Sequence, residues 1–192
     1  MGLLDTVFGR SRRALPDLDD LFALPSAAVT LQAAANLRPT GVGSVCVKPA
    51  EGGAFAGLRD EVQQLLTVGD ASGAAKYEES TDSFGFTWLT RRTTPADISG
   101  LITDLHAVNS TLDQAGFGPA LLCTLVAFSD GEKPTIGLIY LYKRGAWYPF
   151  APVGKDKRDN MRELQIKEQL GHDLKVEQDL SRWFPVWGAP GL

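Results

Sequence analysis

The sequence predicts an α+β protein with a mainly antiparallel sheet and helices packed on one face of that sheet. Segments with helical and strand periodicity follow in the order helix, strand, helix, two strands, helix, three strands, helix. Short turns separate the last three strands, which is typical of an antiparallel meander. The order differs from the regular strand and helix alternation of a doubly wound nucleotide fold. The arrangement loosely resembles secretion-chaperone domains, and a likeness of fold carries no function by itself.

Length and charge limit the architecture and the class of partner. The chain has 192 residues, which suits one domain of ordinary size. We expect residues 1–16 to form a short amphipathic N-terminal segment and residues 17–192 a single α+β domain. The formal net charge is -4, whereas affinity for phosphate backbones needs clustered Lys and Arg. The sequence therefore argues against nucleic acid as a partner.

The first half of the chain contains two predicted helices on either side of a strand. Residues 17–37 predict a helix that breaks at Pro25 and restarts with Ser26 as its N-cap. Residues 42–48 are rich in β-branched residues and predict a strand. Residues 55–66 have apolar side chains at helical spacing and predict the second helix.

The second half supplies the remaining strands and the best helix signal in the chain. Thr94 as N-cap, Pro95 at the first helical position and Asp97 at the third predict a helix that ends at Gly116. A last amphipathic helix is predicted over residues 159–170. Strands are predicted over residues 77–80, 84–91, 120–128, 135–142 and 146–150. Pro149 indicates that the last strand lies at an edge of the sheet or ends there.

Cysteine usage and hydropathy indicate a protein of the reducing cytoplasm. Cys46 and Cys123 each lie inside an apolar, strand-like run, which favours buried free thiols over a disulfide framework or a zinc site. No segment approaches the roughly 18–20 consecutive apolar residues that span a bilayer. We therefore expect a cytoplasmic protein, with peripheral contact at the inner face of the cell membrane left open.

No catalytic, cofactor-binding or metal-binding residues are predicted. The sequence has no Gly-x-Ser-x-Gly elbow, P-loop or dinucleotide fingerprint. The carboxylates Glu78, Glu79, Asp82, Asp104 and Asp113 match no calcium loop, so solvated surface positions are favoured. His106 lies off the apolar stripe of its helix and is expected on the exposed helix surface. His172 follows the helix stop Gly171 and is expected to interact with the negative end of that helix.

An aromatic hairpin over residues 138–150 is the first candidate for partner binding. Aromatic side chains next to basic ones are typical of interface anchors, although cross-strand packing inside a hairpin explains the same pattern equally well. The candidate contacts are Tyr142, Lys143, Arg144, Trp147 and Tyr148.

The N-terminal segment is the second candidate. Its apolar residues share one helical face and its arginines follow, which suits an anionic membrane surface. An isolated helix this short is marginal, so lipid binding, partner binding and disorder stay equally open. The candidate contacts are Leu3, Leu4, Val7, Phe8, Arg10, Arg12 and Arg13.

The C-terminal tail is unusually aromatic. Trp183, Phe184 and Trp187 lie within a few residues of one another. Free tails seldom carry so much apolar area, so docking back onto the domain is favoured over a role as a binding peptide.

Several longer strings together resemble a known family, over residues 17–192. The strings are DLFALPSAAVTL (20–31), LRPTGVG (37–43), TDSFGFTW (81–88), TDLHAVNSTL (103–112), LYKRG (141–145) and WFPVWGAPGL (183–192). They are similar to the actinobacterial PspA-associated family PspAB. The resemblance implies an accessory of phage shock protein A, a coiled-coil, membrane-remodelling protein that responds to envelope stress. It implies no catalytic residues.

The resulting hypothesis is a noncatalytic adaptor of a PspA-type envelope-stress response that acts by protein–protein interaction. A direct membrane-surface sensor is the first alternative. An uncharacterised hydrolase is the second, and it would use Asp82, Asp104 and His106.

Overall fold

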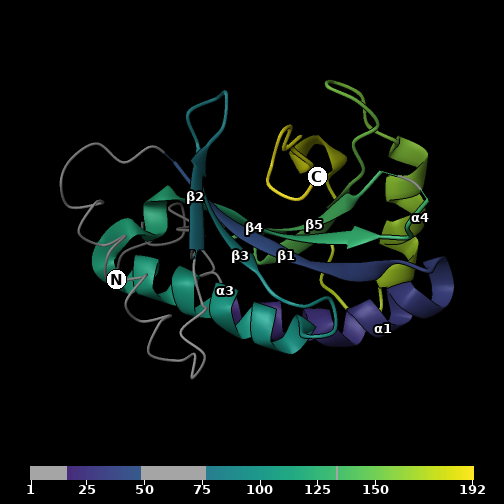
Figure 1. The fold of residues 1–192 in the computed structure, drawn as a ribbon, viewed down its shortest axis with the longest axis horizontal. Helices are drawn as coiled ribbons and strands as arrows, with labels where there is room; N and C mark the ends of the chain where they lie inside the picture. Colours follow the sequence, from purple (N-terminus) through teal and green to yellow (C-terminus); the bar gives the residue numbers. More distant parts are fainter. Residues whose placement is uncertain (1–16, 49–76, 133) are drawn as a thin grey trace, which may run out of the picture.

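A six-stranded sheet with strand order β2-β3-β1-β4-β5-β6 forms the centre of the protein (Figure 1). The computed structural model describes residues 17–48, 77–132 and 134–192. Every pair of neighbouring strands in the sheet is antiparallel, so the predicted α+β class and antiparallel sheet are confirmed. The strands are β1 (Arg38–Val47), β2 (Tyr77–Thr81), β3 (Thr87–Arg92), β4 (Leu121–Ser129), β5 (Ile136–Leu141) and β6 (Ala146–Phe150).

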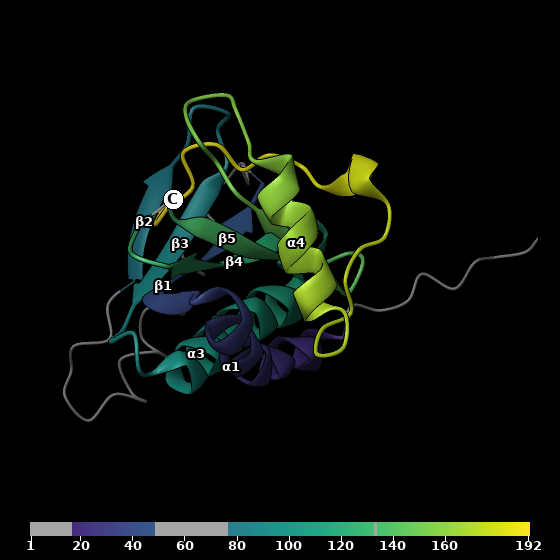
Figure 2. The same cartoon turned by 90° about the vertical axis from the view of Figure 1, so that its right-hand side faces the viewer.

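Helices cover one face of the sheet. The 3-10 helix η1 (Leu18–Ala23) leads into α1 (Leu24–Ala35), and this pair packs with α3 (Ile98–Leu112) beneath the sheet (Figures 1 and 2). Helix α4 (Asn160–Leu170) stands at the β6 side, where it contacts both β6 and α1. Short helical turns complete the set: η2 (Asp113–Phe117), η3 (Gly118–Ala120) and η4 (Leu180–Arg182).

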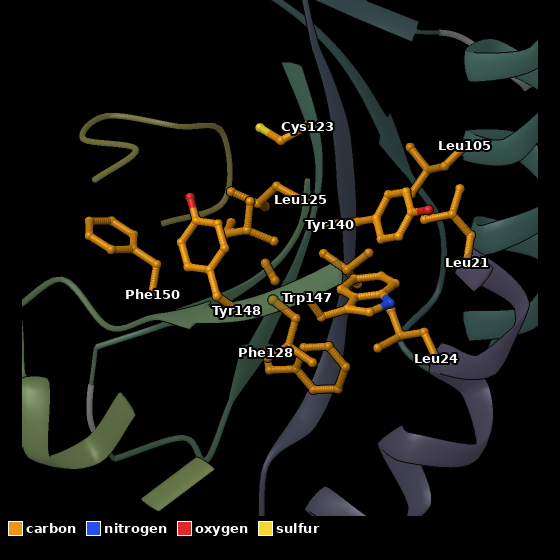
Figure 3. Packing of buried hydrophobic residues seen from close by; sticks show 14 of the residues in the cluster. Leu21, Leu24, Leu105, Cys123, Leu125, Phe128, Tyr140, Trp147, Tyr148 and Phe150 are labelled. Carbon is orange, nitrogen blue, oxygen red and sulfur yellow. The ribbon is translucent and has the colours of Figure 1, made fainter. Parts of the chain in front are cut away.

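Side chains of β5 and β6 are buried on both faces of the sheet. Tyr140 and Trp147 point toward η1 and α1, whereas Tyr148 and Phe150 point to the opposite face (Figure 3). All four are almost fully buried. Strand β6 is an edge of the sheet, as Pro149 predicted. Burial on two faces explains why these strands lack a polar alternation.

Two predicted helix caps are wrong. Helix α1 begins directly after η1, with Pro25 in its first turn, so Ser26 lies inside the helix. Helix α3 begins at Ile98 because Asp97, not Thr94, caps it by accepting a hydrogen bond from the Gly100 amide at 3.0 Å. The carbonyl of Thr94 accepts from the Asp97 amide at 2.9 Å, so Thr94 lies in a turn before the helix.

Several predictions fall outside the described residues. These are the N-terminal segment, the helix over residues 55–66 and hence the division of the chain at residue 16. Within the described part, both cysteines are free and buried, as predicted. No helix in that part is long and apolar enough to cross a membrane. The likeness to secretion chaperones stays a prediction.

Two residues of α1 test which face of the helix is buried. Leu31→Ala is expected to lower the free energy of unfolding by about 2–5 kcal/mol, because the Leu31 side chain is fully buried and its loss leaves a cavity. Val29, which is 70% exposed, is the matched control, and Val29→Ala should change that free energy by less than about 0.5 kcal/mol. Urea unfolding followed by tryptophan fluorescence measures both. Equal losses would contradict the packing of α1.

Candidate functional site

The C-terminal segment (residues 175–192) crosses the sheet on the face opposite α1 and α3. It first pairs with the β6 edge, where the amide of Trp147 donates to the Lys175 carbonyl and the amide of Glu177 donates to the Trp147 carbonyl, both at 2.8 Å. It then runs over the sheet (Figure 2). Near its end, Gly191 packs against Val42 and Ala127. The segment therefore covers one end of this face.

Aromatic contacts hold the segment in place. The hydroxyl of Tyr148 donates to the Phe184 carbonyl at 2.7 Å. Trp183 is buried, its ring stacks on Tyr148 at 5.9 Å, and its indole N–H donates to the Glu177 carbonyl at 3.0 Å. Trp187 meets the ring of Phe150 edge-on at 4.9 Å. The prediction that the tail docks back is thus confirmed for both tryptophans, while Phe184 stays 60% exposed.

A buried ion pair supports the same segment from α4. Arg158 lies 2.9 Å from the Glu163 carboxylate and donates to the Trp183 carbonyl at 2.7 Å. Glu163 also accepts the amide of Ala151 at 2.8 Å. Burial raises the pKa of Glu163, although Arg158 and the Ala151 amide act to lower it. A buried carboxylate with these partners fixes the position of Arg158 and, through it, of Trp183.

A second carboxylate joins the segment to the β5–β6 turn. Glu177 is nearly buried and lies 3.0 Å from Arg144. Burial alone would raise the pKa of Glu177, but the amide of Asp179 and the guanidinium of Arg144 hold it below its usual range. The charged form of Glu177 is therefore the one that the folded structure stabilises.

Beside the C-terminal segment the open face of the sheet carries an apolar groove of about 850 Å³. One wall is the turn between β2 and β3 and the other is the C-terminal segment; Figure 1 shows both above the sheet. The floor is formed by Cys46, Trp88, Leu122, Cys123, Leu141 and Tyr148. The walls are Phe84 and Phe86 on one side and Phe184, Pro185, Val186 and Trp187 on the other. The remaining lining residues are Asp82 and the three cations Lys143, Arg144 and Arg182.

Asp82 builds the wall between β2 and β3. Its carboxylate accepts the amides of Phe84 and Phe86 at 2.9 and 3.0 Å and the indole N–H of Trp88 at 3.0 Å. These bonds close the turn, so β3 starts at Thr87 instead of the predicted position 84. They leave Phe84 64% exposed beside the groove.

The structure divides the predicted hairpin contacts between two faces. Lys143, Arg144 and Tyr148 line the groove. Trp147 is buried on the helix side of the sheet (Figure 3). Tyr142 is also buried, and its hydroxyl donates to Asp113 at 2.6 Å. The candidate contacts of the N-terminal segment, from Leu3 to Arg13, lie outside the described residues.

The residues of the hydrolase alternative have separate partners. His106 lies 3.1 Å from Asp19, and its ring packs on Phe22 at 4.7 Å. Asp104 pairs with Arg91 at 2.7 Å. Asp82 serves the turn described above. In the described part of the chain, no group of three or more His, Cys, Asp or Glu residues is arranged to hold a metal ion.

The sequence indicated the groove only indirectly. In the sequence, Phe84, Phe86 and Trp88 alternate with Gly85 and Thr87, a pattern that predicts three aromatic side chains on one face of a strand. The pattern does not predict which face of the sheet the helices leave open. Cys46 and Cys123 were predicted to be buried, whereas their position on the floor of a groove depends on the pairing of β1 with β4.

The docking of the C-terminal segment is expected to depend on Trp183. Trp183→Ala should lower the free energy of unfolding by about 3–5 kcal/mol, because it removes a buried ring. It should also speed amide hydrogen exchange in residues 175–192. Phe184→Ala, at a mostly exposed position, should cost less than about 1 kcal/mol. Unchanged exchange in Trp183→Ala would show that other contacts hold the segment.

The pH dependence of stability tests Glu177. Because the pKa of Glu177 is lowered from 4.5 in the folded protein, its stabilising effect is present above pH 4.5 and is lost as the pH falls below that value. Glu177→Gln should be less stable than wild type by about 1–3 kcal/mol at neutral pH, and the difference should shrink in acid. The exposed Glu168→Gln is the control. A difference that stays constant down to pH 3 or so would contradict the ionic role.

Comparison with known proteins supplies a family. No curated protein and no solved structure matched the chain. Residues 1–191 match the family described as PspA associated protein B. The match extends over nearly the whole chain and includes the C-terminal segment and both walls of the groove. The chain therefore belongs to the PspA associated protein B family.

Proposed function

We propose that the chain is a noncatalytic accessory protein that binds a PspA-type protein, and that an amphipathic helix of this partner lies in the groove. The family name supports an association with PspA. The family resemblance of the sequence implies that the partner is a coiled-coil protein, and the helices of coiled coils carry apolar stripes. An open apolar groove with cations beside it is the observation that carries the proposal.

The shape of the groove suits one face of a helix. A helix bound in this way presents anchors at positions i, i+3, i+4 and i+7 to a hydrophobic groove. The volume of about 850 Å³ exceeds the space needed for a single side chain. Exposed phenylalanines stand on both walls, Phe84 on one and Phe184 on the other. Docking a helix would remove both rings from water, which favours association.

The charges beside the groove indicate the chemistry of the partner helix. Lys143 is exposed, and the Arg144 side chain stays 49% exposed although it pairs with Glu177. Arg182 is partly exposed on the same side, although it pairs with Asp179 at 3.1 Å. These cations stand out in a chain whose net charge is -4. Acidic residues beside the apolar stripe of the partner would complement them and would speed encounter.

The predicted contacts take separate parts in this proposal. Lys143, Arg144 and Tyr148 would touch the helix, while Trp147 and Tyr142 would support the turn from the helix side of the sheet. The apolar and basic residues of the N-terminal segment remain a proposed second contact, either with the partner or with an anionic membrane. The proposed place of action is the cytoplasm, where a PspA-type partner would be met.

A pair of exposed apolar residues on opposite sides of the protein tests the groove. Phe84→Ser should weaken binding of the purified full-length partner by about 30-fold or more, the effect typical of a central aromatic anchor. Val29→Ser, which alters an equally exposed residue on α1, should bind as wild type does. Isothermal titration calorimetry measures both affinities, and circular dichroism checks that both variants fold.

Two results would overturn this assignment. If Phe84→Ser binds with wild-type affinity, the partner does not use this wall of the groove. If Val29→Ser loses binding instead, the contact surface lies on the helix layer. An absence of binding by the wild-type chain would reject the adaptor hypothesis itself.

A further inference from the structure

The floor of the groove carries two thiols that the proposed function does not use. Cys46 of β1 and Cys123 of β4 lie directly opposite each other in the antiparallel register. Both are free, and both line the groove. We infer that Cys46 and Cys123 form a redox-active pair, which a peroxide converts to an intramolecular disulfide and a small thiol reduces again.

The geometry of the sheet brings the pair within bonding reach. Directly opposed residues of antiparallel strands have Cα atoms about 4.5–5.5 Å apart, and disulfides join Cα atoms about 4.4–6.8 Å apart. The β1–β4 register also shifts between Cys46 and Val47. Such irregularities increase the local twist of the strands.

The groove gives an oxidant access to the pair. Cys46 and Cys123 are only 3% and 6% exposed, but they face a groove of about 850 Å³. Hydrogen peroxide is little larger than water, whose share of liquid volume is about 30 Å³.

The two thiols have different roles in the reaction. Cys123 is the more exposed of the two thiols, at 6% against 3%, and the neighbouring Cys123 thiol, followed by burial, raises the pKa of Cys46. We therefore assign the attack on the peroxide to Cys123: its sulfur bonds to one oxygen, the O–O bond breaks, and the departing hydroxide takes up the proton that Cys123 released. The products of this step are a sulfenic acid on Cys123 and one water.

The second step closes the disulfide. The sulfur of Cys46 attacks the sulfenic sulfur of Cys123, the S–O bond breaks, and the hydroxide leaves with the proton of Cys46 as water. In total, two thiols and one peroxide give one disulfide and two waters. Formation of the disulfide needs no partner protein, so the test of this inference is independent of the test of the proposed function.

Peptide mass mapping of the full-length reduced chain tests the pair. After treatment with one equivalent of hydrogen peroxide, the peptides of Cys46 and Cys123 should appear as one cross-linked species. This species should lack two hydrogens, at the monomer mass, and dithiothreitol should restore the separate peptides. Peptide mapping also distinguishes the disulfide from oxygen added to Met161, whose side chain is exposed. The melting temperature should rise on the order of 10 °C on oxidation, because the bond closes a long loop.

Single variants test the roles of the two residues. In Cys46→Ser the sulfenic acid on Cys123 should persist and be trapped by dimedone, whereas Cys123→Ser should yield no adduct. The inference is overturned if the folded chain forms no cross-link under conditions that oxidise it in urea, or if it forms only disulfide-linked dimers. A dimedone adduct on Cys46 in place of Cys123 would overturn the assignment of roles.

Discussion

The packing of Trp183, from the C-terminal segment, against Tyr148 is the contact on which the face of the sheet opposite the helices depends. The helices η1, α1 and α3 cover only one side of the sheet, so the other side would expose apolar residues of β4, β5 and β6. The Trp183 ring stacks on Tyr148, and its indole N–H donates to the Glu177 carbonyl. Arg158 donates a hydrogen bond to the carbonyl of Trp183. The docked segment covers part of the face, and its residues 184–187 form one wall of the groove.

Two carboxylates connect this wall to the body of the protein. Glu163 binds Arg158 under Trp183, and Glu177 binds Arg144 of the β5–β6 turn. A buried charge without partners would be costly, and these partners satisfy both groups. Arg144 consequently pairs with the buried carboxylate of Glu177 and also lines the groove. The position of Arg144 beside the groove is thus set by its ion pair with Glu177 of the C-terminal segment.

Local patterns predicted most of the fold and little of the groove. Strand β6 was predicted at its observed bounds, and Pro149 placed it at an edge, because periodicity and proline chemistry act over a few residues. The predicted N-cap of α3 was wrong because Thr94 and Asp97 are both favourable N-cap residues. The turn between them decides which of the two caps the helix. The hairpin pattern could not separate Trp147 from Tyr148, because neighbouring strand residues face opposite sides. The groove joins β2–β3, β5–β6 and the tail, which are distant in sequence.

The central claim is that a PspA-type helix occupies the groove, and site-specific photo-cross-linking tests it most directly. A benzophenone side chain at position 184 replaces an exposed phenylalanine of one wall, and the same group at position 29 of α1 serves as the control. Illumination of each chain mixed with the full-length partner should give a cross-linked complex from position 184 alone, attached to an apolar stripe of a partner helix. Cross-links from position 29 without any from position 184 would place the partner on the helix layer and contradict the account.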